Sequence, residues 1–598
     1  MKTPLILTML SIPFLGFAQS ARAVDESQQS VAAMKILDAW HHEQPKPGER
    51  VLHLVCWTPA DREFPADDSA RLTRIMKHIQ NFYRHEMERL GLGARTFNLN
   101  EGDQGQLILH RVRGTHATAH YAVESGSEIR KECLPTLRTA GVDPARETIL
   151  ILCNLATWDE QKLTFTHKSP YYAGGSFRDG TAWQLDSPEL DPLNLKLRQP
   201  VIHDGQYGRI SLGKHNSIFI GGVAHELGHA LGLPHCKARP DEAVRGTALM
   251  GSGNRTYGDE IRGDGRGSFL TLAHGLRLAS HPQFSGSVKG LDQRATAAIE
   301  NLKISTEDKV IRVTGVVQGT PPVYAVVVYF DPDDGGDYNA TTATAVPMAD
   351  GSFSLSCNAL PSGKRGELRL FPLHVNGSAA GQMSQTGFRY SYAVGNDGMP
   401  DLTAIQTAQE LAPVIAALTN GMPEQAKHLA AKIQSPKAAA IARRLIEPVT
   451  PTQSAATYDG NATVVALTSL MPDSVDVGWG QPAFDRVPDE SMVLSSGGQL
   501  FESGIYAHAP ARHVYRLDGK WKSLSGTVGL ANGHPGSVQF ELEGDGKSLW
   551  KSATVKVGST VDFNVTLSDV KQLVLRTHTT DDGAGADWGL WLEPTLTK

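Results

Sequence analysis

Apolar residues recur at spacings of three and four along DDSARLTRIMKHIQNFYRHEMERLGL, residues 67–92. This spacing places the apolar side chains on one face of a helix. The phrase ETILILCNL, residues 147–155, is instead a short apolar run typical of a buried strand. Helix and strand patterns alternate over residues 24–290, which predicts an α+β (α/β-like) domain.

The pattern changes to short alternating strands over residues 300–395. Examples are KVIRVTGVVQG, VYAVVVYFD and ELRLFPLHV, which are separated by Gly, Pro, Asp and Asn. This pattern predicts an Ig-like β-sandwich. Strand phrases such as SVQFELEGDG and VDFNVTLSD return over residues 460–598 and predict a second β-sandwich.

Residues 400–448 lie between the two predicted sandwiches and are rich in Ala, Leu, Ile and Lys. Pro413, Pro423 and Pro436 interrupt this segment, and each is expected to end or kink a helix. The segment is therefore predicted to be a bridge of short helices. With 598 residues in total, the chain is expected to be multidomain.

The first 23 residues carry a basic Lys2, an apolar run and a small residue at Ala21 and at Ala23. This order is typical of a cleaved signal peptide. No later segment approaches the roughly 20 consecutive apolar residues of a membrane span. We therefore expect export without a transmembrane segment, to a periplasmic, cell-surface or extracellular location in a bacterium.

Composition excludes some classes of protein. Hydrophobic residues make up 40% of the chain and charged residues 20%, which fits folded soluble domains. The formal net charge is only −6 and Lys and Arg are spread out, so no nucleic-acid partner is predicted. Two readings stay open for the five cysteines: disulfides in an exported protein, or buried small apolar side chains. They are Cys56, Cys133, Cys153, Cys236 and Cys357.

One motif, HELGHALGLPH at residues 225–235, contains residues that can bind a metal ion. His225 and His229 are four residues apart, so a helix would project both imidazoles from the same face. Gly232 is placed to end that helix in the left-handed conformation, and the chain can then return with His235. Three imidazoles leave a fourth tetrahedral position for water, as in catalytic zinc sites that hold one ion.

Glu226 lies beside His225, where its carboxylate can take a proton from a water molecule at the open position. It is the predicted catalytic general base. Asn216 or Ser217 is expected to cap the helix. His116 and His120 are also four apart, but no Glu lies between them and no third histidine follows, so they are predicted to be ordinary surface or core histidines.

HELGHALGLPH resembles the extended zinc signature of the metzincin metallopeptidases, whose second mark is a methionine turn downstream. Met250, in TALMGSGN, fits that turn. The resemblance implies a metzincin catalytic domain in which Met250 packs beneath the zinc ligands. It also implies that an edge strand binds substrate, for which Thr181, Ala182 and Trp183 are candidates. Tyr257 is a candidate for a tyrosine that reaches the site.

The phrases VGWGQPAFDR, GIYAHAP, VYRLDGKWKSLSGTVGL, GSVQFELEGDGKSLW and GADWGLWLEP occur in order between residues 477 and 594. Together they resemble the carbohydrate-binding module family NPCBM, a jelly-roll β-sandwich of secreted glycan-active enzymes. Aromatic rings stack on sugars, so Trp479, Tyr506 and Trp588 are candidate glycan contacts. The aspartates near Asp331 and Asp581 do not have calcium-loop spacing and are predicted to be solvated turns, and calcium stays an alternative that no motif supports.

Together these features predict a secreted zinc metallopeptidase that hydrolyses peptide bonds in glycosylated protein. Mucin-type O-glycoproteins are the expected substrate class, and the C-terminal module is expected to bind glycan. Three alternatives stay open. They are a general endopeptidase tethered to polysaccharide, a zinc hydrolase of glycan substituents, and a noncatalytic adhesin, which the intact Glu226 disfavours.

Overall fold

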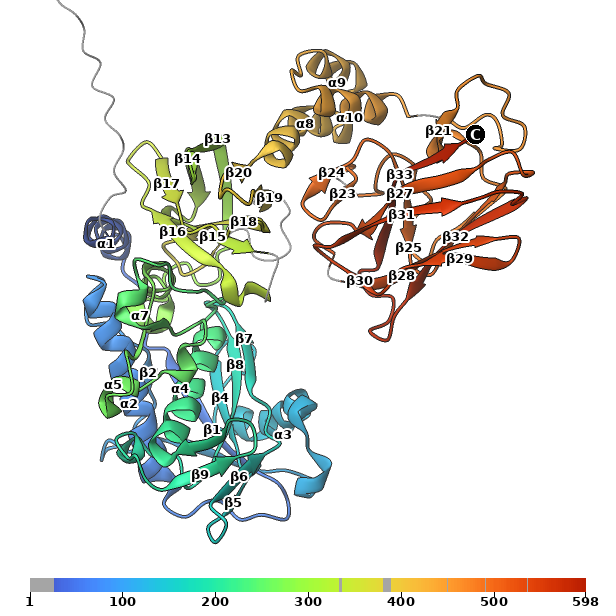
Figure 1. Ribbon diagram of the computed structural model, residues 1–598. Helices are drawn as coiled ribbons and strands as arrows, with labels where there is room; N and C mark the ends of the chain where they lie inside the picture. Colours follow the sequence, from blue (N-terminus) through green and yellow to red (C-terminus); the bar gives the residue numbers. More distant parts are fainter. Residues whose placement is uncertain (1–25, 333–335, 380–388, 449, 490, 535) are drawn as a thin grey trace, which may run out of the picture.

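The computed structural model describes residues 26–598 except 333–335, 380–388, 449, 490 and 535 (Figure 1). The predicted signal peptide, residues 1–23, lies outside the described residues. The chain forms several units of mixed α/β and all-β structure, as the sequence predicts. No helix in the described part of the chain is long and apolar enough to cross a bilayer.

The N-terminal unit is built on a twisted sheet with the order β2-β1-β4-β8-β7, to which β3 adds by pairing with β1. The pairs of β1 with β2, β3 and β4, and of β4 with β8, are parallel, whereas β7 runs antiparallel to β8. The strands are β1 Val51–Thr58, β2 Asn98–Leu99, β3 Leu109–Arg113, β4 Thr148–Cys153, β7 Tyr172–Gly175 and β8 Gly180–Leu185.

Helices cover both faces of this sheet, because residues on its central strands alternate between two cores. On β1, Leu52 and Leu54 face a core shared with α2 and α4, whereas Val55 and Trp57 face a second core with α3. The helices are α1 Glu26–His42, α2 Asp68–Arg89, α3 Gly126–Thr139, α4 Leu212–Ala230, α5 Asp259–Arg262, α6 Leu272–Ala279 and α7 Pro282–Ser285.

A smaller sheet with the order β10-β9-β6-β5 lies beside the first and leads directly into α4. Its strands are β5 Ala156–Asp159, β6 Thr164–His167, β9 Val201–Asp204 and β10 Gly208–Ser211. A short two-stranded pair, β11 Thr247–Ala248 and β12 Ser268–Phe269, follows α4. These elements hold α4 and the segment after it in the interior.

The next unit is a sandwich of a three-stranded sheet, β13-β14-β17, and a five-stranded sheet, β16-β15-β18-β19-β20. The predicted β-sandwich is therefore present, while the Ig-like assignment stays a prediction. The strands are β13 Thr296–Glu307, β14 Val310–Thr320, β15 Val323–Pro332, β16 Thr341–Ala345, β17 Ser352–Cys357, β18 Arg365–His374, β19 Arg389–Val394 and β20 Pro400–Asp401.

Strand β15 is buried on both faces. Val326, Val328 and Phe330 face the interior of the sandwich. Val327 and Tyr329 face the other way and join the core of the N-terminal unit. The first sandwich and the N-terminal unit therefore share one continuous apolar core, which places loops of the sandwich beside the N-terminal unit (Figure 1).

The predicted helical bridge consists of α8 Thr403–Thr419, α9 Pro423–Ala430 and α10 Pro436–Ile446. Two of the proline predictions were wrong: Pro423 and Pro436 begin helices, and Pro413 lies inside α8. A proline is tolerated in the first turn because the backbone N–H that it lacks would have no partner there. The helices pack together and against Val493 and Leu500.

The C-terminal unit is a second sandwich, with sheets β21-β33-β27-β31 plus β25 and β22-β26-β32-β28-β29 plus β30. Its strands are β21 Val464–Ala466, β22 Ser474–Asp476, β23 Ser495–Ser496, β24 Gln499–Leu500, β25 Gly504–His508, β26 Ala511–Arg516, β27 Ser523–Leu530, β28 Ser537–Gly544, β29 Lys547–Lys551, β30 Val555–Lys556, β31 Thr560–Thr566, β32 Gln572–Thr579 and β33 Trp588–Thr597.

All five cysteines are buried and none is in a disulfide bond. Of the two readings left open by the sequence, the structure therefore has the second, in which cysteines act as small apolar side chains. Burial raises the pKa of Cys153 well above its ordinary value, which keeps that thiol protonated. The stability of the N-terminal unit thus depends on packing rather than on cross-links.

Candidate metal centre and active site

Helix α4 presents the first part of the HExxHxxGxxH motif. It begins earlier than predicted, at Leu212, and its N-cap is Ser211, whose hydroxyl accepts from the Lys214 N–H at 3.1 Å. Asn216 and Ser217 are therefore not caps. They are buried on the helix, and the Asn216 side-chain oxygen accepts from the Asp191 N–H at 2.7 Å. The early start arises because β10 runs directly into the helix.

The end of α4 has the predicted glycine turn. Gly232 has a φ of 82°, in the left-handed region. Its N–H donates to the His229 carbonyl, and the Leu233 N–H donates to the Gly228 carbonyl, both at 2.9 Å. These bonds satisfy the last carbonyls of the helix. The chain then reverses and brings His235 back to the helix.

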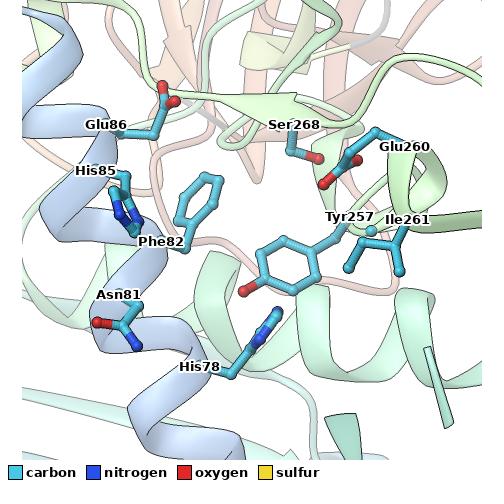
Figure 2. A pocket seen from close by; sticks show the side chains of 10 residues that line it. His78, Asn81, Phe82, His85, Glu86, Tyr257, Glu260, Ile261 and Ser268 are labelled. Carbon is cyan, nitrogen blue, oxygen red and sulfur yellow. The ribbon is translucent and has the colours of Figure 1, made fainter. Parts of the chain in front are cut away.

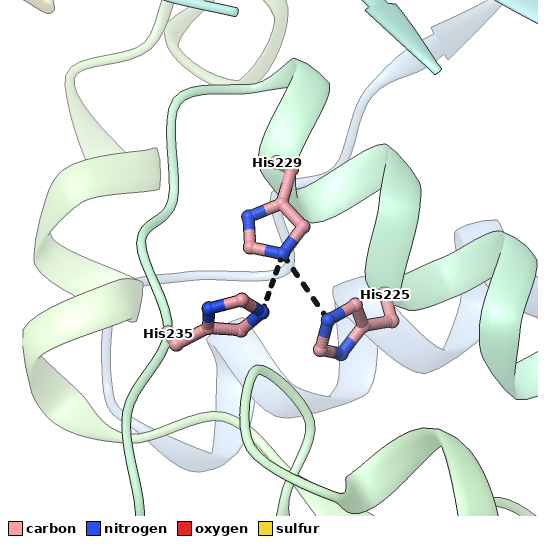
Figure 3. A group of neighbouring side chains, drawn as sticks. All are labelled: His225, His229 and His235. Carbon is pink, nitrogen blue, oxygen red and sulfur yellow. Dashed lines mark hydrogen bonds between the residues drawn. The ribbon is translucent and has the colours of Figure 1, made fainter. Parts of the chain in front are cut away.

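His225, His229 and His235 converge on one point (Figure 3). The Nε2 atom of His229 lies 3.1 Å from Nε2 of His225 and 3.0 Å from Nε2 of His235. Two nitrogen ligands of a tetrahedral zinc ion are about 3.3 Å apart. The three imidazoles thus have the spacing that one zinc ion requires.

Backbone carbonyls set the orientation of two of the rings. Nδ1 of His225 donates to the Leu249 carbonyl at 2.7 Å, and Nδ1 of His229 donates to the Leu233 carbonyl at 2.8 Å. A neutral imidazole with a protonated Nδ1 carries a lone pair on Nε2. Burial lowers the pKa of His225 to about 3, so this ring is neutral. Lone pairs that face one another across 3.1 Å favour a cation between them.

Glu226 directly follows His225 in the sequence, and the residue is 7% exposed. Burial raises its pKa to about 8. A cation held by the imidazoles would favour the ionised form and oppose this shift. Glu226 is thus poised to exchange protons near neutral pH.

Met250 lies against helix α4 at Gly228, the residue before His229. A Cβ atom added to Gly228 would lie 2.4 Å from the Met250 sulfur, so only glycine permits this contact. The Met250 carbonyl also accepts from the Cys236 N–H at 3.2 Å. The turn therefore ties the segment that carries His235 to the floor of the cluster.

Two tyrosines near the histidines, Tyr171 and Tyr338, form an aromatic wall that was not predicted from the sequence. Tyr338, from the loop between β15 and β16 of the first sandwich, stacks on His235 with ring centroids 3.6 Å apart. Tyr171 lies just before β7, and its pKa is raised by burial first and then by Tyr207, Glu226 and Tyr338. No local pattern marks Tyr338, because it reaches the histidines from more than 100 residues downstream.

The edge-strand prediction was wrong in its choice of strand. Thr181, Ala182 and Trp183 lie on β8, which pairs with β4 on one side and β7 on the other. Thr181 and Ala182 are buried, and Trp183 packs against the core beside α3. The edge is β7, which has no second strand partner among the described residues. Strand order is a tertiary property that the residue pattern does not contain.

Tyr257 does not join the histidines. Its ring packs edge-on against His78, with centroids 5.6 Å apart, and also contacts Phe82 of α2. Figure 2 shows it in a separate cavity of about 290 Å³ between α2 and the segment from Tyr257 to Ser268. Tyr257 is therefore a packing residue between α2 and α4, where it contacts Gly221.

An aromatic cluster lies at the surface of the C-terminal module. Trp479 is 54% exposed, and its ring lies 5.1 Å from that of Trp588. Tyr506 is buried, and its hydroxyl donates to the Trp479 carbonyl at 3.2 Å. His534, which the sequence analysis did not single out, stacks on Trp588 at 4.0 Å. The ring of Trp479 is thus exposed and lies against the buried ring of Trp588.

The aspartates that raised the question of calcium have other partners. Asp582 accepts from the hydroxyls of Ser537 and Thr580, and Asp587 accepts from the Ser537 N–H. Asp331 pairs with Arg369 at 2.8 Å. Asp581 and Asp582 lie in a turn, as predicted, whereas Asp331 lies near the end of strand β15, so the prediction of a turn does not hold at Asp331.

The class of the C-terminal module follows from its sequence and fold together. Residues 463–597 match the family model described as NPCBM/NEW2 domain. The module is therefore a member of this carbohydrate-binding family, as the resemblance implies. No curated protein sequence matches the chain.

Comparison with solved structures finds OgpA from Akkermansia muciniphila. Wild-type OgpA is 25% identical with a TM-score of 0.47, over 59% of this chain and 94% of that one. Inactive OgpA with an O-glycopeptide (glycodrosocin) substrate is 24% identical with a TM-score of 0.47, over 58% and 94% of the chains. A CBM51 from Clostridium perfringens GH95 with methyl-galactose is 24% identical with a TM-score of 0.21, over 23% and 100%.

Proposed function

We propose that this chain is a metzincin-type zinc metallopeptidase that hydrolyses peptide bonds in glycosylated proteins, with mucin-type O-glycoproteins as its substrate class. The observation that carries the proposal is the convergence of three Nε2 atoms beside a buried glutamate. The attached NPCBM/NEW2 module supports a glycan-bearing substrate. The sequence of residues 1–23 supports export from a bacterium.

His225, His229 and His235 would hold the zinc ion, and the Leu249 and Leu233 carbonyls would keep two of the imidazoles in the required tautomer. Zinc in such a site lowers the pKa of a water ligand and polarises a substrate carbonyl. Glu226 takes the proton from the attacking water and later delivers it to the leaving amine. No covalent intermediate with the protein is needed.

The free edge of β7 supports the binding of an extended peptide. An added strand would pair with the β7 backbone, as peptides do at other sheet edges. Tyr171 and Tyr338 would border the peptide near Glu226 and His235. Because Tyr338 belongs to the first sandwich, that domain is expected to contribute directly to the substrate cleft.

The experiment is incubation with a mucin-type glycoprotein before and after enzymatic removal of its glycans, with mass spectrometry of the fragments. The proposal expects new peptide termini that depend on glycosylation. Equal cleavage of deglycosylated protein or of casein would support a general endopeptidase instead. Release of acetate or sugar with intact peptide bonds would contradict a peptidase.

The module is tested separately with Trp479→Ala. Trp479 offers the exposed ring of the aromatic cluster, so its loss should weaken attachment to glycoprotein by about tenfold. Turnover of a short glycopeptide should change little. Trp550→Ala, on another strand of the same module, is the control. Equal effects of both variants on binding would argue against the cluster as the glycan site.

A further inference from the structure

A second group of metal-ligating side chains lies on the surface of the N-terminal unit. It consists of His116, after β3, His120, at the end of the short 3-10 helix Thr118–His120, and Glu128, in the first turn of α3. One donor atom from each residue lies within 4.8 Å of the others. The sequence offers only the two histidines at a spacing of four, and folding supplies the carboxylate.

The geometry within the group is specific. Nε2 of His120 lies 3.0 Å from one Glu128 carboxylate oxygen, and Nε2 of His116 lies 4.0 Å from the same oxygen. The two imidazole rings are 4.0 Å apart at 30°. Ligand atoms around a tetrahedral zinc ion are about 3.3 Å apart, so small side-chain rotations would bring all three atoms to one ion.

Hydrogen bonds to α3 hold the backbone that carries the two histidines in place. Glu132, one turn after Glu128 on α3, accepts from the Thr115 N–H at 3.1 Å and from the Tyr121 hydroxyl at 2.9 Å. The Trp57 indole also donates to this carboxylate, at 2.8 Å. These bonds anchor the loop on both sides of His116, so little order would have to be created when a ligand binds.

We propose that His116, His120 and Glu128 form a second metal site, which binds zinc or a related divalent transition-metal ion. Two imidazoles and one carboxylate suit zinc, nickel or cobalt, whereas calcium and magnesium prefer oxygen ligands throughout. The histidines are 51% and 45% exposed, so water completes the coordination and the ion exchanges with solvent.

The position of this site gives the ion a structural role. The first turn of α3 also supplies the Gly126 N–H, which donates to the Tyr172 hydroxyl of β7 at 3.0 Å. A metal ion would tie the loop that bears His116 and His120 to this turn. It would thereby brace the end of α3 that contacts edge strand β7.

The test measures zinc per chain by mass spectrometry of the metal after equilibration with zinc, together with competition against a fluorescent chelator. The wild-type chain should bind about two zinc ions and His120→Ala about one. In a His229→Ala background, which disables the buried cluster, one weaker site should remain. Glu128→Gln should weaken that site at least about tenfold.

His428→Ala, which removes an exposed histidine of the helical bridge, is the matched control and should leave the zinc count unchanged. Equal zinc stoichiometry and affinity in wild type, His116→Ala, His120→Ala and Glu128→Gln would overturn the proposal. As single variants, His116→Ala, His120→Ala and Glu128→Gln keep the cluster of His225, His229 and His235 intact, so circular dichroism and peptide cleavage report their folding. Because the readout is binding, the result does not depend on which substrate the enzyme cleaves.

Discussion

Two histidine pairs in this chain have the same spacing of four residues and very different surroundings. His225 and His229 lie on α4, where His225 is buried and His229 half-buried, with Glu226 next to His225 in the sequence. His116 and His120 lie on a loop and a short turn at the surface, with Glu128 brought in by α3. Identical spacing is therefore compatible with two clusters that differ in burial, the proposed catalytic centre and the proposed exposed metal site.

The difference lies in what burial does to the neighbouring carboxylate. Burial raises the pKa of Glu226 to about 8, and a cation held by the imidazoles would lower that pKa again. Glu128 is 43% exposed, and water screens its charge. The buried cluster is thus suited to chemistry and the exposed cluster to ligation alone.

Stepwise chelation tests this contrast most severely. With increasing chelator, the exposed site should lose its metal first without loss of peptidase activity, because solvent reaches it directly. Activity should then vanish as the buried site empties. Metal content and cleavage are measured on the same samples. If activity instead falls with the first metal released, the proposal that the cluster of His225, His229 and His235 is the catalytic one would be contradicted.

Exchange of the two carboxylates for amides gives the next largest effect. Glu226→Gln should lower kcat by about 10²–10⁴-fold while the zinc of the buried site is retained, because the general base is lost and the imidazoles are not. Glu128→Gln should leave kcat within about twofold of wild type. Steady-state kinetics with metal analysis decides, and an active Glu226→Gln enzyme would refute the proposed mechanism.

A histidine buried away from both clusters tests the effect of burial by itself. Burial lowers the pKa of His513, in the C-terminal module, to about 4. The unfolded chain, with a pKa near 6.5, binds a proton first as pH falls, so stability is lost between about pH 6.5 and 4. We expect a loss of about 2 kcal/mol between pH 7.5 and 5.

His513→Leu should remove this part of the pH dependence. Hydrogen exchange of β26 and β32 amides, followed at both pH values, measures the local free energy of opening. His116→Leu, at the exposed cluster, is the comparison variant and should leave the pH dependence of these amides unchanged. An unchanged pH dependence in His513→Leu would show that other groups account for it.

The smallest expected effect concerns Tyr338, whose ring stacks on His235, whereas at the exposed cluster Tyr121 meets His120 edge-on with centroids 5.1 Å apart. Tyr338→Ala should lower kcat/KM by about tenfold, because the ring that stacks on His235 is lost. Tyr338→Phe separates the ring from its hydroxyl, since recovery of activity would assign the effect to stacking. If Tyr338→Ala has the same kinetics as the wild type, Tyr338 of the first sandwich does not contribute to the substrate cleft.

Much of the site was predictable because its determinants are local. The spacing of His225, His229 and Gly232 specifies a helix face and a left-handed helix end within one stretch of chain. The early start of α4 was missed because Ser211 caps a helix whose first turn carries no motif. The predictions for Pro423 and Pro436 failed because a proline can also begin a helix.

The sequence by itself predicted the three histidines that the structure brings together, the glutamate that follows the first of them, and the succession of an α/β unit, two sandwiches and a helical bridge. Only the tertiary structure decided that β7 rather than β8 is the edge, that Tyr338 stacks on His235, and that Glu128 joins His116 and His120. The physical reason is that hydrophobic periodicity and caps act within a few residues. Strand order and contacts between domains depend on how distant apolar faces are buried together.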